Sequence, residues 1–184
     1  MRIQSESWGV YRKAYNAGKK NMRKMTKEGV DPYLPILTNI VTDDMITEKV
    51  NIGIMGIPTD RICGLATDAD KERYTRDFLP IPSPDSDFAT KWCKIYWHYL
   101  GNKGGCCPVT CYEYLGVFYI IDGAKIVSIA KCHGIPTITA SVVRLMPVKS
   151  DEPAIKLYYD FVNCLEKTGL YQVSFSRPRS LPRF

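Results

Sequence analysis

The sequence predicts an α+β protein in which helices pack beside a small mixed sheet. The first reason is the stretch from residue 117 to residue 145, where a short apolar run, a tight turn, a helical segment and a second strand follow one another. The second reason is an amphipathic pattern near the N-terminus, with apolar residues three or four positions apart. The third is a hydrophobic content of 45% in 184 residues, which is enough for the core of one domain.

The N-terminal pattern predicts an amphipathic helix from about Ser5 to Lys27. Its apolar stripe consists of Trp8, Tyr11, Tyr15, Gly18, Met22 and Met25, and most Lys and Arg residues lie off it. We expect the helix to dock on its own domain or on a second copy and to bury Trp8, Tyr11, Tyr15 and Met22, because a lone helix is marginal in water. Attachment of its basic face to a membrane surface or a nucleic acid is the alternative. Residues 1–35 are assigned to this helix and its connector, and residues 36–184 to the main domain.

The first half of the main domain is predicted to contain one strand and two helices. The strand spans Val50–Ile57 and the helices span Glu72–Phe78 and about Ser86–Leu100, with a turn over Thr59–Ile62 and a loop over Leu65–Lys71 between them. Gly53 and Gly56 indicate a bulge or a close backbone approach within the strand. The second helix carries a core-facing row that consists of Trp92, Ile95, Tyr96 and Tyr99.

The second half contains the strand, turn and helix that carry the fold prediction. Val117–Ile121 is apolar, β-branched and aromatic, which is typical of a buried strand. It is expected to form a hairpin about Leu115-Gly116 with Pro108–Leu115, since so short a link cannot make a parallel crossover. After Asp122-Gly123 the spacing becomes helical over Ala124–His133, until Gly134 and Pro136 stop the helix. Three further elements are a strand over Thr137–Leu145, a helix over Glu152–Lys167 and a short strand over Tyr171–Phe175.

The net charge of +6 is unevenly distributed along the chain. Residues 1–30 carry +6 and the last eight residues carry +3, so the region between them carries −3. A duplex-binding face would normally give the folded body a basic excess, so this distribution argues against such a face there. No apolar run is long enough to cross a membrane and no apolar segment of a signal peptide follows the N-terminal charges, so a cytoplasmic location is expected.

The seven cysteines are expected to be free thiols, as is usual in a reducing compartment. Cys106, Cys107 and Cys111 lie close together in the sequence, with His98 and His133 as the available partners. Metal-binding knuckles usually come in two pairs, and no second pair is present, so no metal site is predicted. Four carboxylates are candidates for a general base, and each is interpreted as a cap or a solvated side chain: Glu113, Asp122, Asp85 and Asp87.

The Asp122-Gly123 turn is the strongest candidate site. It precedes a helix whose first N–H groups have no intrahelical acceptor, and the helix dipole favours an anion there. Lys125 adds a cation in the first turn. These features predict a weak phosphate site at Asp122, Gly123, Ala124 and Lys125.

Several segments, in their order, resemble the ParB/sulfiredoxin-like superfamily. They are residues 118–123 and 134–138 around the turn and helix, together with residues 31–35, 57–62, 76–80, 85–92, 158–161 and 174–176. The similarity is to the ParB-like, nuclease-like domains at the front of longer proteins of anaerobic Gram-positive bacteria, and it covers most of the chain.

The resemblance implies a ParB/sulfiredoxin-like fold and a nucleotide or nucleic-acid phosphate at the Asp122-Gly123 turn, with ATP or CTP and Mg as candidate ligands. It also adds Arg76 as a second cation of the site. Where relatives place a phosphate-reaching Arg, this chain has Ile126, and Lys cannot replace a bidentate guanidinium. No cysteine lies in the turn, which argues against sulfiredoxin chemistry. The catalytic residues, and whether the chain is an enzyme, are left open.

Three functions are therefore considered. The first is nucleotide or nucleic-acid phosphate binding without efficient catalysis. The second is a non-catalytic structural or regulatory module of a larger protein, with a homodimer or further domains contacted through the N-terminal helix. The third is an active nuclease or kinase of the superfamily.

Overall fold

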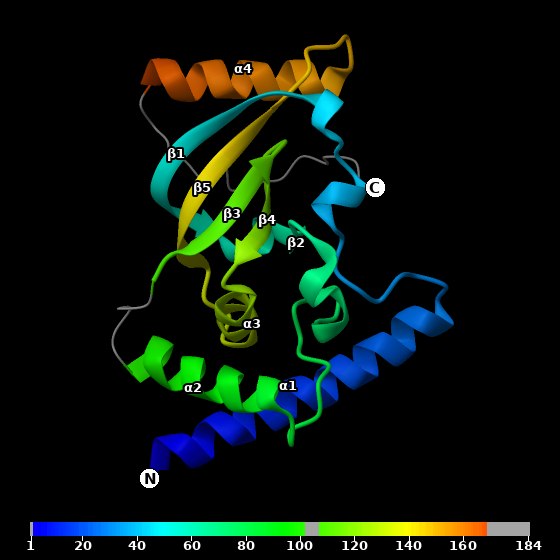
Figure 1. Cartoon of the computed structure of the whole chain (residues 1–184), viewed down its shortest axis with the longest axis vertical. Coiled ribbons are helices and arrows are strands. Elements are labelled where there is room, and N and C mark those ends of the chain that lie inside the picture. Colours follow the sequence, from blue (N-terminus) through cyan, green and yellow to red (C-terminus); the bar gives the residue numbers. More distant parts are fainter. Residues whose placement is uncertain (1, 102–106, 169–184) are drawn as a thin grey trace.

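A five-stranded mixed sheet forms the centre of the protein, in the order β1-β5-β3-β4-β2 (Figure 1). The structure is a computed structural model, and it describes residues 2–101 and 107–168. The strands are β1 (Ile46–Pro58), β2 (Ile62–Leu65), β3 (Val109–Tyr114), β4 (Val117–Asp122) and β5 (Thr137–Pro147). β5 pairs antiparallel with β1 and parallel with β3, while β4 pairs antiparallel with β3 and parallel with β2. The mixed α+β class expected from the sequence is confirmed.

The described residues form four α-helices around the sheet: α1 (Arg2–Lys27), α2 (Asp87–Gly101), α3 (Ala124–Cys132) and α4 (Pro153–Thr168). Short 3-10 turns are η1 (Leu37–Asn39), η2 (Asp43–Met45), η3 (Thr59–Arg61) and η4 (Asp68–Arg73). Figure 1 shows α1, α2 and α3 at one end of the sheet and α4 across the other end. No helix within the described ranges is both long and apolar enough to span a membrane.

The predicted hairpin between β3 and β4 is confirmed. The two strands pair antiparallel around Leu115 and Gly116, whose φ values are 51° and 81°. Two consecutive positive φ values are the signature of a type I′ turn, whose twist matches that of the flanking strands. The predicted bulge in β1 is also present, since the pairing with β5 shifts between Asn51 and Gly53.

The main core lies where α1, α2 and α3 meet the sheet, and it is unusually aromatic. Tyr11 of α1 and Trp92 of α2 are both fully buried, with their ring centroids 5.3 Å apart. Tyr74 and Phe78 belong to the same cluster. Docking of the N-terminal helix is therefore confirmed, with Tyr11 buried completely and three stripe residues half-buried: Trp8, Tyr15 and Met22.

One local prediction is wrong and one strand was not predicted. The turn expected over Thr59–Ile62 is present as η3, but β2 follows it directly and was missed, because this strand depends on pairing with β4. The helix expected over Glu72–Phe78 is replaced by the end of η4 and a turn, in which the Phe78 N–H donates to the carbonyl oxygen of Thr75 at 2.8 Å. Phe78 has φ 62°, which no right-handed helix allows. This backbone places the rings of Tyr74 and Phe78 together in the core, 6.0 Å apart. The strand expected over Tyr171–Phe175 lies outside the described residues.

Candidate anion site at the start of α3

The turn between β4 and α3 depends on a glycine. Gly123 is the N-cap of α3 and has φ 96° and ψ 17°, a left-handed conformation that L side chains rarely adopt. A Cβ at this position would also lie 2.7 Å from Cγ1 of Val109, at the start of β3. Backbone conformation and space therefore both require glycine, and the beginning of α3 is held tightly against the sheet.

The first turn of α3 has backbone donors to spare. The N–H groups of Ile126 and Val127 donate to the carbonyl oxygen of Gly123, at 2.8 and 3.2 Å. The N–H groups of Ala124 and Lys125 have no acceptor among the residues that the structure describes. The carboxylate of Asp122 accepts from the Gly123 N–H at 2.8 Å, so it stabilises the turn and does not cap the helix. Two donors at the positive end of the helix dipole are thus available to an anion.

A cavity of about 290 Å³ opens beside this turn. Four of the five predicted site residues line it, namely Asp122, Gly123, Ala124 and Lys125. The other lining residues come from β2 and the segment after it, from α2, from the end of β4 and from the first turn of α3: Leu65, Thr67, Ala69, Asp70, Ile95, Ile120, Ile121 and Ile126. The cavity therefore has polar groups at the turn and apolar walls beside them.

Lys125 is the one cationic residue among the described residues that line this cavity. Its Nζ lies 4.9 Å from the ring centroid of Phe88, and its side chain is half-buried. Burial lowers the pKa of Lys125, the charges of Arg73 and Lys91 act in the same direction, and the carboxylates of Asp70 and Asp122 oppose the shift. An anion bound here would favour the charged form of the Lys125 side chain, which burial disfavours.

Arg76, the fifth predicted residue, is not among the residues that line this cavity. Its charge acts on Cys63, together with that of Lys131 at the far end of α3. Lys131 donates to the carbonyl oxygen of Ile62 at 2.8 Å and lies 5.0 Å from the ring of Phe78. Arg76 and Lys131 thus belong to a different environment from Lys125, although Lys125 and Lys131 share one short helix.

Sequence reasoning missed the contribution of the segment around η4. Asp70 lines the cavity, and Arg73 pairs with it at 2.9 Å between Nη1 and Oδ1. Thr67 adds a hydroxyl to the lining. These residues lie about fifty positions before the turn and follow no motif, and the pairing of β2 with β4 brings them to the site.

The other sequence candidates lie elsewhere. Glu113 is not the solvated side chain that the sequence allowed: it is 3% exposed, pairs with Arg144 and accepts the Gly116 N–H in the hairpin turn. Asp85 and Asp87 are exposed at the start of α2, where Oγ of Ser86 accepts the Ala89 N–H at 3.2 Å. The six cysteines within the described ranges are all free thiols, and Cys106 lies outside those ranges. No group of three or more His, Cys, Asp or Glu residues suited to a metal ion occurs in the described part.

A comparison of the chain with protein-family models, with curated proteins and with solved structures finds no match in any of the three. The site must therefore be judged by its own chemistry.

Proposed function

We propose that the cavity at the start of α3 binds the phosphate of a nucleotide or of a nucleic acid, without efficient catalysis, and that the domain is ParB-like. The single observation that carries the proposal is that the N–H groups of Ala124 and Lys125, which have no acceptor among the described residues, occur together with the Lys125 cation at one cavity. Backbone donors at a helix start and a nearby cation are the usual elements of a phosphate site.

The rest of the lining is compatible with a nucleotide rather than a bare phosphate. The apolar walls contributed by Ile95, Ile121 and Ile126 can contact a base or a sugar. The carboxylates of Asp70 and Asp122 would repel an isolated phosphate, whereas a Mg²⁺ ion carried in by ATP or CTP would offset that repulsion. We therefore expect weak binding, with a Kd on the order of 1 mM, or about −4 kcal/mol.

An NMR titration tests the proposal with ATP, CTP and inorganic phosphate, each with and without Mg²⁺. Shifts are expected to centre on Gly123, Ala124 and Lys125, and Lys125→Ala should weaken binding about tenfold, the loss of one charge-assisted hydrogen bond. Lys131→Ala is the matched control, since that lysine lies on the same helix but outside the cavity, and it should leave binding unchanged. Absence of shifts at the turn at millimolar ligand would contradict the proposal.

The alternative is a non-catalytic structural or regulatory module of a larger protein. One observation favours it: Ile126, at the position where ParB-like relatives place an Arg, contributes an apolar wall to the cavity. An absence of chemical-shift changes in the titration would support this alternative. Turnover of nucleotide or cleavage of nucleic acid, lost in Lys125→Ala, would instead support the third function, an active nuclease or kinase.

A further inference from the structure

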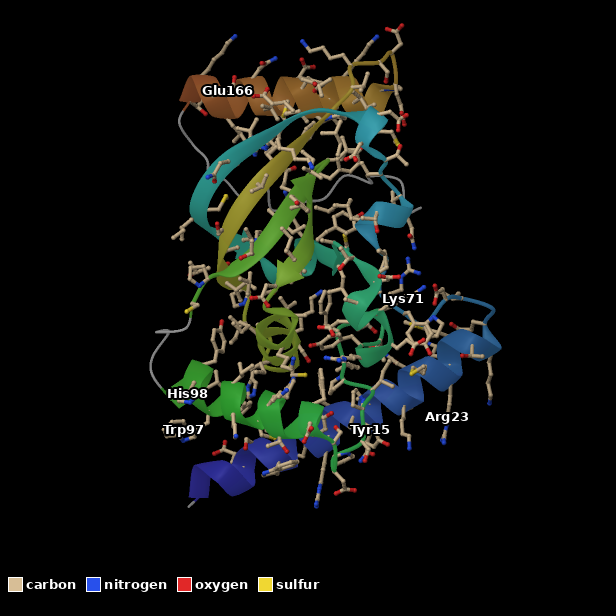
Figure 2. The ribbon with its side chains drawn as sticks, viewed as in Figure 1. Tyr15, Arg23, Lys71, Trp97, His98 and Glu166 are labelled. Carbon is tan, nitrogen blue, oxygen red and sulfur yellow. The ribbon has the colours of Figure 1, made fainter. Side chains whose placement is uncertain are left out.

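The outward face of α1 carries a row of exposed cations that the proposed function does not use. We call it the basic stripe; it consists of Arg12, Lys13, Lys19, Lys20, Arg23, Lys24 and Lys27. Residues 12 and 27 are separated by about 22 Å along the helix axis, at 1.5 Å per residue. Figure 2 shows Arg23 on the side of α1 that faces away from the sheet.

Almost none of this charge is neutralised by the protein itself. Among the described residues, the only carboxylate within salt-bridge distance of the stripe is Glu28, whose Oε1 lies 3.9 Å from Nζ of Lys24. Both side chains of that pair are more than half exposed, so the pair is weak. Residues 1–30 carry a net charge of +6, equal to that of the whole chain, so residues 31–184 are neutral overall. The excess positive charge of residues 1–168 therefore resides on α1.

The stripe is also held on a fixed support. On the opposite face of α1, Tyr11 is fully buried and its hydroxyl donates to the carbonyl oxygen of Pro82 at 2.8 Å. Gly18 lies so close to the chain that a Cβ would be 2.8 Å from the carbonyl oxygen of Pro80. Near the C-terminal end, Nδ2 of Asn21 donates to Asp77 at 2.6 Å. These contacts fix which side of α1 faces solvent.

This support also indicates the class of partner. A helix that lies on a membrane surface needs an apolar face to insert, but the apolar face of α1 is already packed on α2. What remains outside is mainly charge, with Asn16 and Thr26 as the exposed uncharged polar side chains of the described part of α1. A regular polyanion that is bound through its charges alone fits this surface, and the phosphate backbone of a nucleic acid is such a polyanion.

We propose that the basic stripe of α1 is a docking surface for a nucleic-acid backbone, bound without sequence preference. The flexible Lys side chains contact phosphates and release counterions, so affinity falls steeply with salt. This inference concerns a different surface from the cavity at α3 and does not depend on it.

The test uses the full chain and fluorescently labelled 24-base-pair DNA duplexes of two unrelated sequences, with anisotropy as the readout. The stripe variant is Lys13→Glu/Lys20→Glu/Lys27→Glu, whose three positions are seven residues apart and so lie on one side of the helix. The control is Lys49→Glu/Lys149→Glu/Lys167→Glu, which changes net charge equally at exposed positions on β1, in the connector after β5 and on α4. Circular dichroism checks that both variants are folded.

We expect both sequences to bind the wild type equally. The stripe variant should bind about 100-fold more weakly at low salt, and its slope of log K against log salt should be smaller by about 2.7, or about 0.9 for each lost contact. The control should change binding less than threefold. Equal losses in the two variants would mean that net charge alone governs binding and would overturn the proposal.

Two further arms separate the other partners. Vesicles containing phosphatidylserine should not compete with the duplex; if they bind through the stripe while the duplex does not, the surface is a membrane site and the proposal fails. Sedimentation shows whether the stripe instead contacts a second copy, which would also overturn it. Titration of the stripe variant with ATP should still shift Gly123 if the α3 site exists, so the two proposals can fail independently.

Discussion

The two ends of the sheet bury the same rows of side chains in different ways. On β3 the inward row begins with Val109 and Cys111, and on β5 it includes Val142; all three belong to the apolar core beneath α2 and α3. Two residues further along each strand the rows continue as Glu113 and Arg144, which pair with each other near α4. One continuous surface is therefore apolar at one end and ionic at the other.

The ionic end is fully hydrogen-bonded around one carboxylate. The carboxylate of Glu113 accepts from Nε of Arg144, from the hydroxyl of Tyr158 at 2.8 and 2.9 Å, and from the N–H of Gly116 at 2.7 Å. The side chains of Glu113 and Arg144 are only 4% and 9% exposed. Tyr158 comes from α4, so a charge buried between two strands also holds a helix.

The difference teaches that the two ends should fail differently. An apolar core loses stability in proportion to the volume removed, and neighbouring side chains partly relax. A buried ion pair contributes little net stability when complete, but removal of one partner is costly because a charge remains in a poorly solvated place. Substitutions at each end can separate these two behaviours.

The largest effect is expected at the apolar end, for Trp92→Ala. Trp92 is fully buried, its ring stacks on Tyr96 with centroids 5.6 Å apart, and its Nε1–H donates to Oγ of Ser128 at 3.1 Å. We expect a loss of about 3–5 kcal/mol in the free energy of unfolding, measured by urea denaturation. Trp97→Ala is the control, since Trp97 is 42% exposed, and should cost less than about 0.5 kcal/mol. A loss below about 1 kcal/mol at Trp92 would show that the aromatic cluster is loosely packed.

Elements set by the local sequence could be predicted, whereas contacts between distant segments could not. The spacing of apolar residues by three and four positions predicted α1 and α2, and the strand-turn-helix pattern predicted β4 and α3. These patterns could be detected because each lies within a short stretch of sequence. β2 and the approach of Asp70 to the cavity depend on pairing between segments more than fifty residues apart. Glu113 is buried on the same side of β3 as Val109 and Cys111, as the alternation along a strand would indicate. Its partners Arg144 and Tyr158 lie on β5 and α4 and could not be identified from the sequence around Glu113.

At the ionic end, Glu113→Gln is expected to lower the free energy of unfolding by about 3 kcal/mol. The amide keeps the shape of the side chain and an acceptor for Gly116, but it removes the negative charge that faces Arg144. Hydrogen exchange should show faster opening in α4 than in α2, since Tyr158 loses a charged acceptor. The double variant Glu113→Gln/Arg144→Gln should lose less free energy of unfolding than the sum of the losses in the two single variants. Strict additivity would mean that the two residues are not coupled.

Tyr158→Phe should have the smallest effect, about 1.5–2 kcal/mol, the value of one hydrogen bond to a charged group. Tyr159→Phe is the matched control on the same helix, because the hydroxyl of Tyr159 donates to the neutral carbonyl oxygen of Pro147 at 2.6 Å. That change should cost about 1 kcal/mol or less. Equal costs for the two tyrosines would contradict a special role of the Glu113 carboxylate.

The pH dependence of the Tyr158→Phe effect tests the same contact without altering packing. Burial, followed by the charge of Glu113, raises the pKa of Tyr158 above its ordinary value of 10.0. The folded state therefore keeps a proton that the unfolded state releases above about pH 10, so this stabilisation is complete below that pH and is lost as pH rises further. The difference in unfolding free energy between wild type and Tyr158→Phe should be constant from pH 7 to 9 and shrink between pH 10 and 11. A difference that stays constant through this range would mean that Tyr158 is not held as a neutral donor to Glu113.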